Sequence, residues 1–163
     1  MWFQVKLWFQ VKLFQMEASR PLEFLQLARL ILRLSRQFQR VLDGPLTERL
    51  DFGMKGLFVL RAAQLGYHHP SRIAAFLNMA SPSLSRTLER LEGRGLLERE
   101  LDGEDRRRFR FAVTEEGEEA VSRARALVAE TLSARYAHIE REQVLEASAV
   151  LESLAAQMEE PGG

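Results

Sequence analysis

The stretch from residue 81 to residue 114 constrains the fold of this chain more than any other part. It reads SPSLSRTLERLEGRGLLERELDGEDRRRFRFAVT, a helix rich in Ser, Thr and Arg followed by a charged hairpin with DGEDRRR at its tip. Such a helix suits a DNA major groove, and a basic hairpin suits phosphates or a minor groove. The order predicts a helix-turn-helix unit that ends in a β-wing.

The composition of the chain is that of a globular protein. Of its 163 residues, 46% are hydrophobic and 28% are charged, and the formal net charge is zero. A neutral total leaves DNA binding open, because the local distribution of charge decides it. The absence of cysteine excludes disulfides, thiolate metal sites and a cysteine redox switch. The sequence shows neither a membrane-spanning apolar run nor a secretory signal, so we expect a cytoplasmic protein with no membrane partner.

The N-terminal residues contain an internal repeat, because WFQVKL at 2–7 occurs again at 8–13. Apolar and polar residues alternate along it with a period of two, which favours a strand. We interpret residues 1–15 as a repeated leader outside the core domain, since the sequence offers no strand to pair with it. Met16 would then make a natural start. An added interaction arm is the alternative.

Helical periodicity and breaker residues organise the rest of the chain. Apolar residues spaced three and four apart predict a helix over about 20–42, which Asp43-Gly44-Pro45 is expected to end. A second helix is predicted over about 51–65, and a third, shorter one begins near Pro70. Two long helices are predicted at the C-terminal end, the first starting at Thr114 and running past Tyr136, the second covering about 141–158.

Residues that favour caps and turns frame the helix predicted from residue 81, which we call the reading helix, and the hairpin after it. Ser81 is expected to be the N-cap of the reading helix, with Pro82 at the first helical position, where a missing N–H is tolerated. That helix should run to about residue 94, and Gly95 should adopt the left-handed conformation after it. The arms of the hairpin are predicted at 96–100 and 109–114.

The reading helix separates into a buried and a polar side. Leu84, Leu88 and Leu91 follow one another at spacings of four and three, so they should face the core. The remaining faces carry short hydroxyls, suited to close approach to bases and phosphates, and guanidinium groups, suited to guanine or phosphate. An ordinary solvated face is the alternative, which the adjoining wing disfavours. The candidate DNA-binding residues of this helix are Ser81, Ser83, Ser85, Arg86, Thr87 and Arg90.

The hairpin tip supplies further candidate DNA contacts. Arg106 and Arg107 are expected to reach DNA, while Asp102 begins the turn and Asp105 fixes the direction of an arginine. Alternation along the return strand should send Phe109, Phe111 and Val113 to one side, and Arg108 and Arg110 to the other. The alternative is a surface ion-pair cluster that contributes only about 0–1 kcal/mol.

The amphipathic helices at both chain ends predict a homodimer. A winged unit needs only about residues 51–114, within a single domain over 16–163. The helices at about 20–42 and 118–158 carry apolar stripes that something must cover. Packing across a two-fold axis would place two reading helices roughly 34–36 Å apart, matching successive major grooves of a pseudo-palindromic operator. Packing of these helices onto their own winged unit is the alternative.

The residues LSRTLERLEGRGLLERELDGEDRRRFRFAVTEEG resemble the signature of the MarR family of bacterial winged helix-turn-helix regulators. The D-x-x-D-R-R wing is the most specific part, and the resemblance covers about residues 20–158. It implies a homodimer joined by the first and last helices, a reading helix in the major groove and a wing arginine, best matched by Arg106, in the minor groove. It also implies that small phenolic or anionic ligands bind between the dimer interface and the DNA-binding lobe. Gly103, where the family usually has proline, and Gly93, where it often has a basic residue, depart from the pattern.

Other features carry little evidence for a function. His68 and His69 have no third ligand at metal-binding spacing, and His138 stands alone in a helix, so loop, capping or surface roles are expected and no metal is. No nucleophile motif, phosphate loop or paired catalytic carboxylates occur, so we expect neither an enzyme nor a cofactor.

The sequence therefore predicts a mainly α protein with a small β-wing, in which a winged helix-turn-helix core is flanked by long N- and C-terminal dimerisation helices. We interpret it as a homodimeric DNA-binding transcriptional regulator, a repressor released by a small aromatic or anionic effector. A DNA-binding protein without a ligand and a dimeric module that binds a protein are the alternatives.

Overall fold

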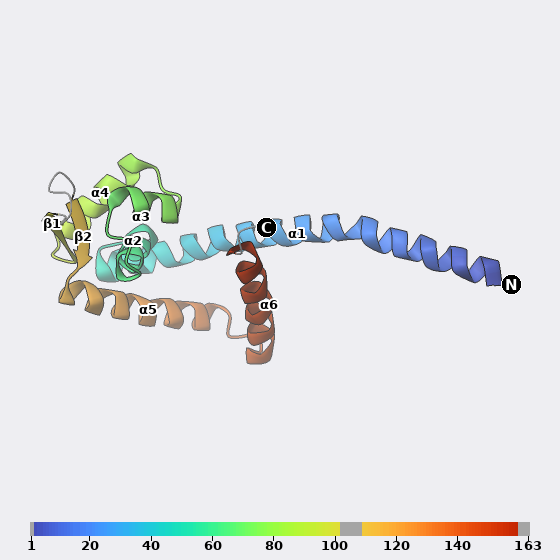
Figure 1. Cartoon of the computed structure of the whole chain (residues 1–163). Coiled ribbons are helices and arrows are strands. Elements are labelled where there is room, and N and C mark those ends of the chain that lie inside the picture. Colours follow the sequence, from blue (N-terminus) through green and yellow to red (C-terminus); the bar gives the residue numbers. More distant parts are fainter. Residues whose placement is uncertain (1, 102–108, 160–163) are drawn as a thin grey trace. The chain divides into compact units, whose positions relative to one another are not determined.

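Helices dominate the fold, and a single hairpin interrupts them in the part of the chain that is described (Figure 1). The computed structural model describes residues 2–101 and 109–159, with side chains described for 22–101 and 109–157. The expected mainly α fold with a small β-wing is confirmed. The elements are α1 (Trp2–Leu50), α2 (Met54–Gln64), α3 (Pro70–Leu77), α4 (Ser81–Glu92), β1 (Leu97–Leu101), β2 (Phe109–Val113), α5 (Glu115–Arg135) and α6 (Arg141–Glu159).

The chain divides into two compact units, Met1–Phe58 and Val59–Gly163, with the boundary inside α2. The second unit contains the helix-turn-helix, the wing and both C-terminal helices. None of the described helices is both long enough and apolar enough to cross a membrane. The expected single domain over 16–163, with a leader at 1–15, stays a prediction.

The prediction of a strand preference in the WFQVKL repeat is wrong, because the backbone of residues 2–13 is helical and continuous with the rest of α1. A strand is stable only when another strand pairs with it. Extending an existing helix adds one backbone hydrogen bond per residue and avoids the cost of a new nucleus. The continuing helix therefore overrides the alternating pattern.

The predicted helix end at Asp43-Gly44-Pro45 is also wrong, since α1 continues to Leu50. Proline within a helix removes one backbone hydrogen bond, and glycine adds conformational entropy to the unfolded chain. Burial offsets these costs, because Leu42 and Leu46 are 4% and 0% exposed. The Asp43 carboxylate accepts a hydrogen bond of 2.8 Å from the backbone N–H of Met54, the first residue of α2, so it stabilises the start of that helix.

The helix-turn-helix of the second unit is built from α3, α4 and the short turn between them. Asn78 ends α3 with a φ of 47°, and its N–H bonds back to the carbonyls of Ala74 and Ala75. Asparagine is among the few residues that tolerate this left-handed conformation. The core of the unit is formed by apolar side chains from the helices and the wing, among them Val59, Leu60, Ile73, Leu84, Leu88, Leu91, Leu97, Phe111, Ala120, Val121 and Ala124.

The start of α4 differs from the prediction by one residue. Ala80 occupies the N-cap position and makes no side-chain cap bond, so Ser81 and Pro82 fill the first two helical positions. Pro82 fits there because the first N–H groups of a helix have no intrahelical partner. The helix ends at Glu92, two residues before the predicted end, and Gly95 takes the expected left-handed conformation with a φ of 67°.

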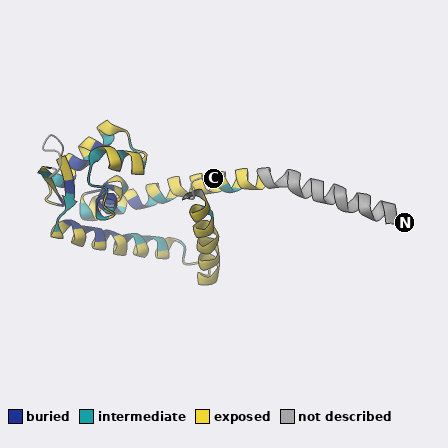
Figure 2. Ribbon diagram, in the orientation of Figure 1, coloured by how far each residue is buried: buried dark blue, intermediate teal, exposed yellow. Residues whose placement is uncertain are grey.

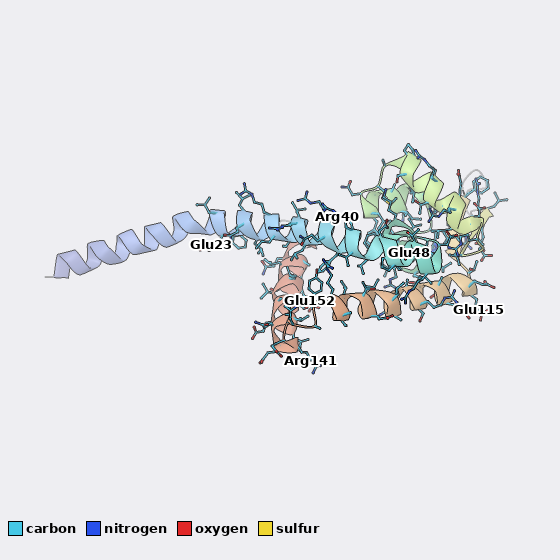
Figure 3. The ribbon with its side chains drawn as sticks, turned by 180° about the vertical axis from the view of Figure 1, so that it is seen from behind. Glu23, Arg40, Glu48, Glu115, Arg141 and Glu152 are labelled. Carbon is cyan, nitrogen blue, oxygen red and sulfur yellow. The ribbon has the colours of Figure 1, made fainter. Side chains whose placement is uncertain are left out.

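The C-terminal pair of helices begins at a well-made cap. Thr114 is the N-cap of α5, its Oγ1 accepting a 3.0 Å hydrogen bond from the N–H of Gly117, and Glu115 lies in the acidic first turn (Figure 3). The prediction that this helix runs past Tyr136 is wrong, since α5 ends at Arg135. Tyr136 is no longer helical, with a φ of −113° and a ψ of 24°, and its N–H donates a hydrogen bond to the carbonyl oxygen of Leu132.

Candidate nucleic-acid interface

The reading helix α4 has one buried side and one exposed side. Leu84, Leu88 and Leu91 are 2%, 4% and 1% exposed, as the sequence predicts. The side chains that point away from this core are exposed. A helix anchored by three leucines presents its opposite face rigidly, which a surface that reads base edges requires. The exposed residues of α4 are Ser81, Pro82, Ser85, Arg86, Glu89 and Arg90.

The predicted hydroxyl contacts divide into two kinds. Ser81 and Ser85 are exposed, and their hydroxyls are accessible to a ligand. Thr87 is half-buried, and its Oγ1 donates a 2.9 Å hydrogen bond to the backbone carbonyl of Ser83, which is itself half-buried. A hydroxyl that bonds back to its own helix has one fewer group to offer a base. Ser81 and Ser85 are therefore the better placed of the predicted hydroxyl contacts.

The wing strands pair in antiparallel register, with Leu97 opposite Val113, Arg99 opposite Phe111 and Leu101 opposite Phe109. These pairs share one face of the hairpin. Phe111 is 6% exposed, whereas Leu101 and Phe109 are 58% and 41% exposed. The apolar face is therefore covered at the base of the wing and uncovered toward the tip.

Arginines on the two faces of the wing have different partners. The Arg99 guanidinium lies 3.6 Å from the centre of the Phe109 ring, a cation–π contact that covers part of this exposed aromatic surface. On the other face, Arg110 Nε donates a 2.7 Å hydrogen bond to Glu100 Oε2 across the strands. Arg110 points away from the phenylalanines, as predicted, and is already neutralised by Glu100. The tip residues Asp102, Asp105, Arg106, Arg107 and Arg108 lie outside the described residues.

The loop before α3 is joined to the wing through His68. The N–H of Phe111 donates a 2.9 Å bond to the His68 carbonyl, and His68 Nδ1 lies 3.1 Å from the Phe111 carbonyl oxygen. A tautomer with its proton on Nδ1 donates to that oxygen. These contacts give His68 a role in the loop. Within the described ranges, no three histidine, aspartate or glutamate side chains are arranged to hold a metal ion.

Thr114 links the end of the wing to the turn after α4. Its Oγ1 donates a 2.6 Å hydrogen bond to the carbonyl of Gly95, and its N–H bonds to the carbonyl of Leu96. Gly117 lies so close to this turn that a Cβ there would collide with the Leu96 carbonyl oxygen and with Val113. The close approach requires glycine, and it fixes α5 against the base of the reading unit.

Comparison with known proteins supports the winged helix-turn-helix fold. The sequence profile of the MarR family matches residues 57–108, which span the helix-turn-helix and the first arm and tip of the wing. Residues 57–108 are thus similar to the MarR family. This confirms the resemblance inferred from the wing motif. No curated protein sequence matches the chain.

Solved MarR-family structures share the fold. A cysteine-to-serine mutant of MarR from E. coli is 21% identical, covers 79% of this chain and 96% of its own, and superposes with a TM-score of 0.72. The regulator BldR from Sulfolobus solfataricus is 20% identical, with coverage of 80% and 95% and a TM-score of 0.67. The same MarR mutant complexed with operator DNA is 22% identical, with coverage of 81% and 95% and a TM-score of 0.63.

A cleft of about 590 Å³ lies beside α4. Residues at the start of α3, one side of α4 and the inner face of the wing line it. Its polar lining includes Ser85, Glu89 and Glu92 from α4, together with Arg99 from β1. The cleft therefore separates the wing from the side of α4 that carries these two carboxylates.

Sequence reasoning missed Glu89 among the exposed residues of α4. Ser85 and Arg86 were selected because hydroxyls and guanidinium groups are familiar DNA ligands, whereas a carboxylate near phosphates was passed over. Spacing alone would have found it, because Glu89 lies three residues after Arg86 and four after Ser85. Arg99 and Glu100 were also missed, since the contacts of both depend on the pairing register of the wing.

Proposed function

We propose that this protein is a homodimeric, sequence-specific DNA-binding transcriptional regulator that acts as a repressor. The observation that carries the proposal is the arrangement of α4, whose exposed Ser85, Arg86 and Arg90 lie opposite a buried leucine stripe and next to a β-wing. This geometry suits insertion of the exposed face into a major groove. Similarity of the 57–108 segment to a family of regulators supports the same reading.

The wing is proposed to bind the flanking DNA. Arg106 is the residue that enters the minor groove, Arg107 binds phosphate, and Asp102 and Asp105 support the turn. The paired strands below the tip and the joining of His68 to Phe111 supply a firm base for such contacts. The Glu100–Arg110 pair leaves Arg110 less available for phosphate.

The dimer is proposed to form through the apolar faces of α1 and α6. In Figure 2 the described part of α6 is exposed along almost all of its length, and so is α1 between residues 22 and 40. Exposed apolar faces on two long helices are typical of an interface. A two-fold dimer then predicts a pseudo-palindromic operator. The exposed large apolar side chains of these helices include Leu22, Phe24, Leu25, Leu30, Ile31, Leu32, Leu34, Val144, Leu145, Val150 and Leu151.

Release from DNA is proposed to follow binding of a small aromatic or anionic effector. DNA binding requires one particular separation of the two reading helices. A ligand that prefers another separation lowers DNA affinity by its differential affinity for the two states, typically about 1–3 kcal/mol. By linkage, saturating operator must weaken effector binding by the same factor.

A salt titration with the purified full chain tests DNA binding. Affinity for duplex DNA should fall steeply as salt rises, because bound arginines release condensed counterions. Arg86→Ala should cost about 1–3 kcal/mol and relax base preference, whereas Arg106→Ala should weaken binding to all sequences. Arg135→Ala, an exposed arginine at the end of α5, is the matched control and should leave affinity unchanged. Absence of salt-dependent DNA binding would favour a protein-interaction module instead.

The effector requires its own test. Small aromatic acids are added to the protein–operator complex, and operator affinity is measured with and without each compound. A drop in affinity with a reciprocal loss of effector affinity supports the repressor mechanism. Operator affinity that no such compound changes would point to a regulator without a ligand.

A further inference from the structure

The exposed surface of α4 carries a carboxylate among its cations. Glu89 is exposed, follows Arg86 by three residues and precedes Arg90. Residues three apart lie side by side on a helix surface, so Glu89 and Arg86 are neighbours, and Glu89 also lines the cleft next to the wing. Among the residues that the structure describes, the Glu89 carboxylate has neither a hydrogen-bonding nor an ionic partner. Its acceptor oxygens are therefore available.

If α4 faces DNA, as in the proposed function on which this inference rests, an unpaired carboxylate at this position weakens DNA binding. Phosphates repel it, and displaced water must be replaced by hydrogen-bond donors. The major groove offers donors only at the N4 amino group of cytosine and the N6 amino group of adenine. Adenine presents its N7 acceptor beside the N6 amino group, and N7 repels a carboxylate. Cytosine presents no acceptor of its own beside its N4 amino group. Cytosine is therefore the base that a glutamate satisfies.

We propose that Glu89 is a specificity-determining residue that accepts a hydrogen bond from the N4 amino group of a cytosine in the operator. Arg86, beside it, donates to guanine O6 and N7. The two side chains have opposite charge and opposite hydrogen-bonding roles, so together they select a C·G-containing step. Glu89 contributes discrimination between bases and no attraction to phosphates, whereas arginines that bind phosphate contribute attraction to DNA of any sequence.

The sign of the effect separates this role from a phosphate contact. Loss of an arginine that binds phosphate weakens binding to every sequence. Loss of the Glu89 charge should strengthen binding to random DNA, because a repulsive charge is removed, and should weaken the preference for cytosine. A purely structural role, in which Glu89 braces the wing from the side of the cleft it helps to line, predicts weaker binding without altered base preference.

The experiment uses the full chain and binding selection from random duplexes, comparing wild type with Glu89→Gln, Glu89→Ala and the control Glu98→Gln. Glu98 is exposed on β1 and outside α4. Wild type and Glu98→Gln should select a cytosine at one position in each half-site, and both Glu89 variants should lose that selection. Unchanged base preference in Glu89→Ala would overturn the inference while leaving DNA binding intact.

A base analogue isolates the hydrogen bond itself. The selected cytosine is replaced by 2-pyrimidinone, which lacks the 4-amino group. Wild-type affinity should fall by about 5- to 150-fold, and Glu89→Ala should be insensitive to the replacement. An equal fall in both proteins would overturn the inference. If the wild-type chain binds no duplex DNA at all, the proposed function fails as well, so the two failures are distinguishable.

Discussion

The helices α4 and α6 both carry an apolar stripe, yet the stripe of α4 is buried and that of α6 is exposed. Leu84, Leu88 and Leu91 of α4 are almost completely buried, whereas Val144 and Leu151 of α6 are 49% and 43% exposed. An apolar stripe indicates that a face will be covered, and it does not indicate by what. In α4 the cover comes from the same chain, and in α6 the described residues supply none. The contrast identifies α6 as the face that a second copy is proposed to cover.

The largest effect is expected from a charge placed in the stripe of α6. Leu151→Glu should convert a homodimer into a monomer, because an unpaired charge buried in an interface costs about 3–5 kcal/mol and a two-fold interface contains it twice. Sedimentation velocity at micromolar concentration gives the mass. Ser153→Glu, on the exposed opposite side of α6, is the control and should remain dimeric. A Leu151→Glu protein that stays dimeric would remove α6 from the interface.

A cavity in the reading unit should have the next largest effect. Leu84→Ala should lower the free energy of unfolding by about 2–5 kcal/mol, because it deletes a fully buried side chain. That loss should be the same at all protein concentrations. Leu145→Ala, at a position 56% exposed, should instead change the melting temperature in a concentration-dependent way, since its contribution comes through dimerisation. Concentration-independent losses of equal size would contradict the contrast between the two helices.

A smaller loss is expected at the link between the wing and α5. Thr114→Ala removes the cap of α5 and the hydrogen bond to the Gly95 carbonyl, so it should cost about 0.5–2 kcal/mol in urea unfolding. Thr114→Ser retains the hydroxyl and should lose less. Equal losses in the two variants would show that the methyl group, rather than the hydroxyl, stabilises this junction.

The smallest effect is expected at the surface of the wing. Glu100→Gln breaks the ion pair with Arg110, in which the two side chains are 37% and 48% exposed. Exposed pairs contribute about 0–1 kcal/mol, and salt screens them. Urea unfolding at low and high salt should show a small loss that disappears at high salt. A loss that persists at high salt would mean that Glu100 stabilises the wing through more than its charge.

The reading unit was predictable from the sequence because its signals are local. Leu84, Leu88 and Leu91 have helical spacing, Gly95 marks a left-handed turn, and Thr114 precedes an acidic first turn. Each signal acts within a few residues, so the sequence contains both the cause and its effect. The candidate contacts Ser85 and Arg86 follow from the same spacing, and the structure leaves both exposed.

The errors occurred where distant residues or competing elements decide. Gly44 and Pro45 are strong helix breakers, yet burial of Leu42 and Leu46 keeps α1 continuous through them. The alternating WFQVKL repeat prefers a strand, but it extends a helix because no partner strand pairs with it. Propensities of a fraction of a kcal/mol to about 3 kcal/mol per residue are readily overridden by such interactions.

The sequence by itself determined that the chain forms a winged helix with a reading helix of defined polarity, because hydrophobic period, capping and turn residues act over short distances. Only the tertiary structure decided that Arg110 is paired with Glu100, and that Glu89 has no partner among the described residues. Those outcomes depend on strand register and on which side chains meet after packing. No local pattern encodes them, since the same side chain is free or paired according to what the fold brings beside it.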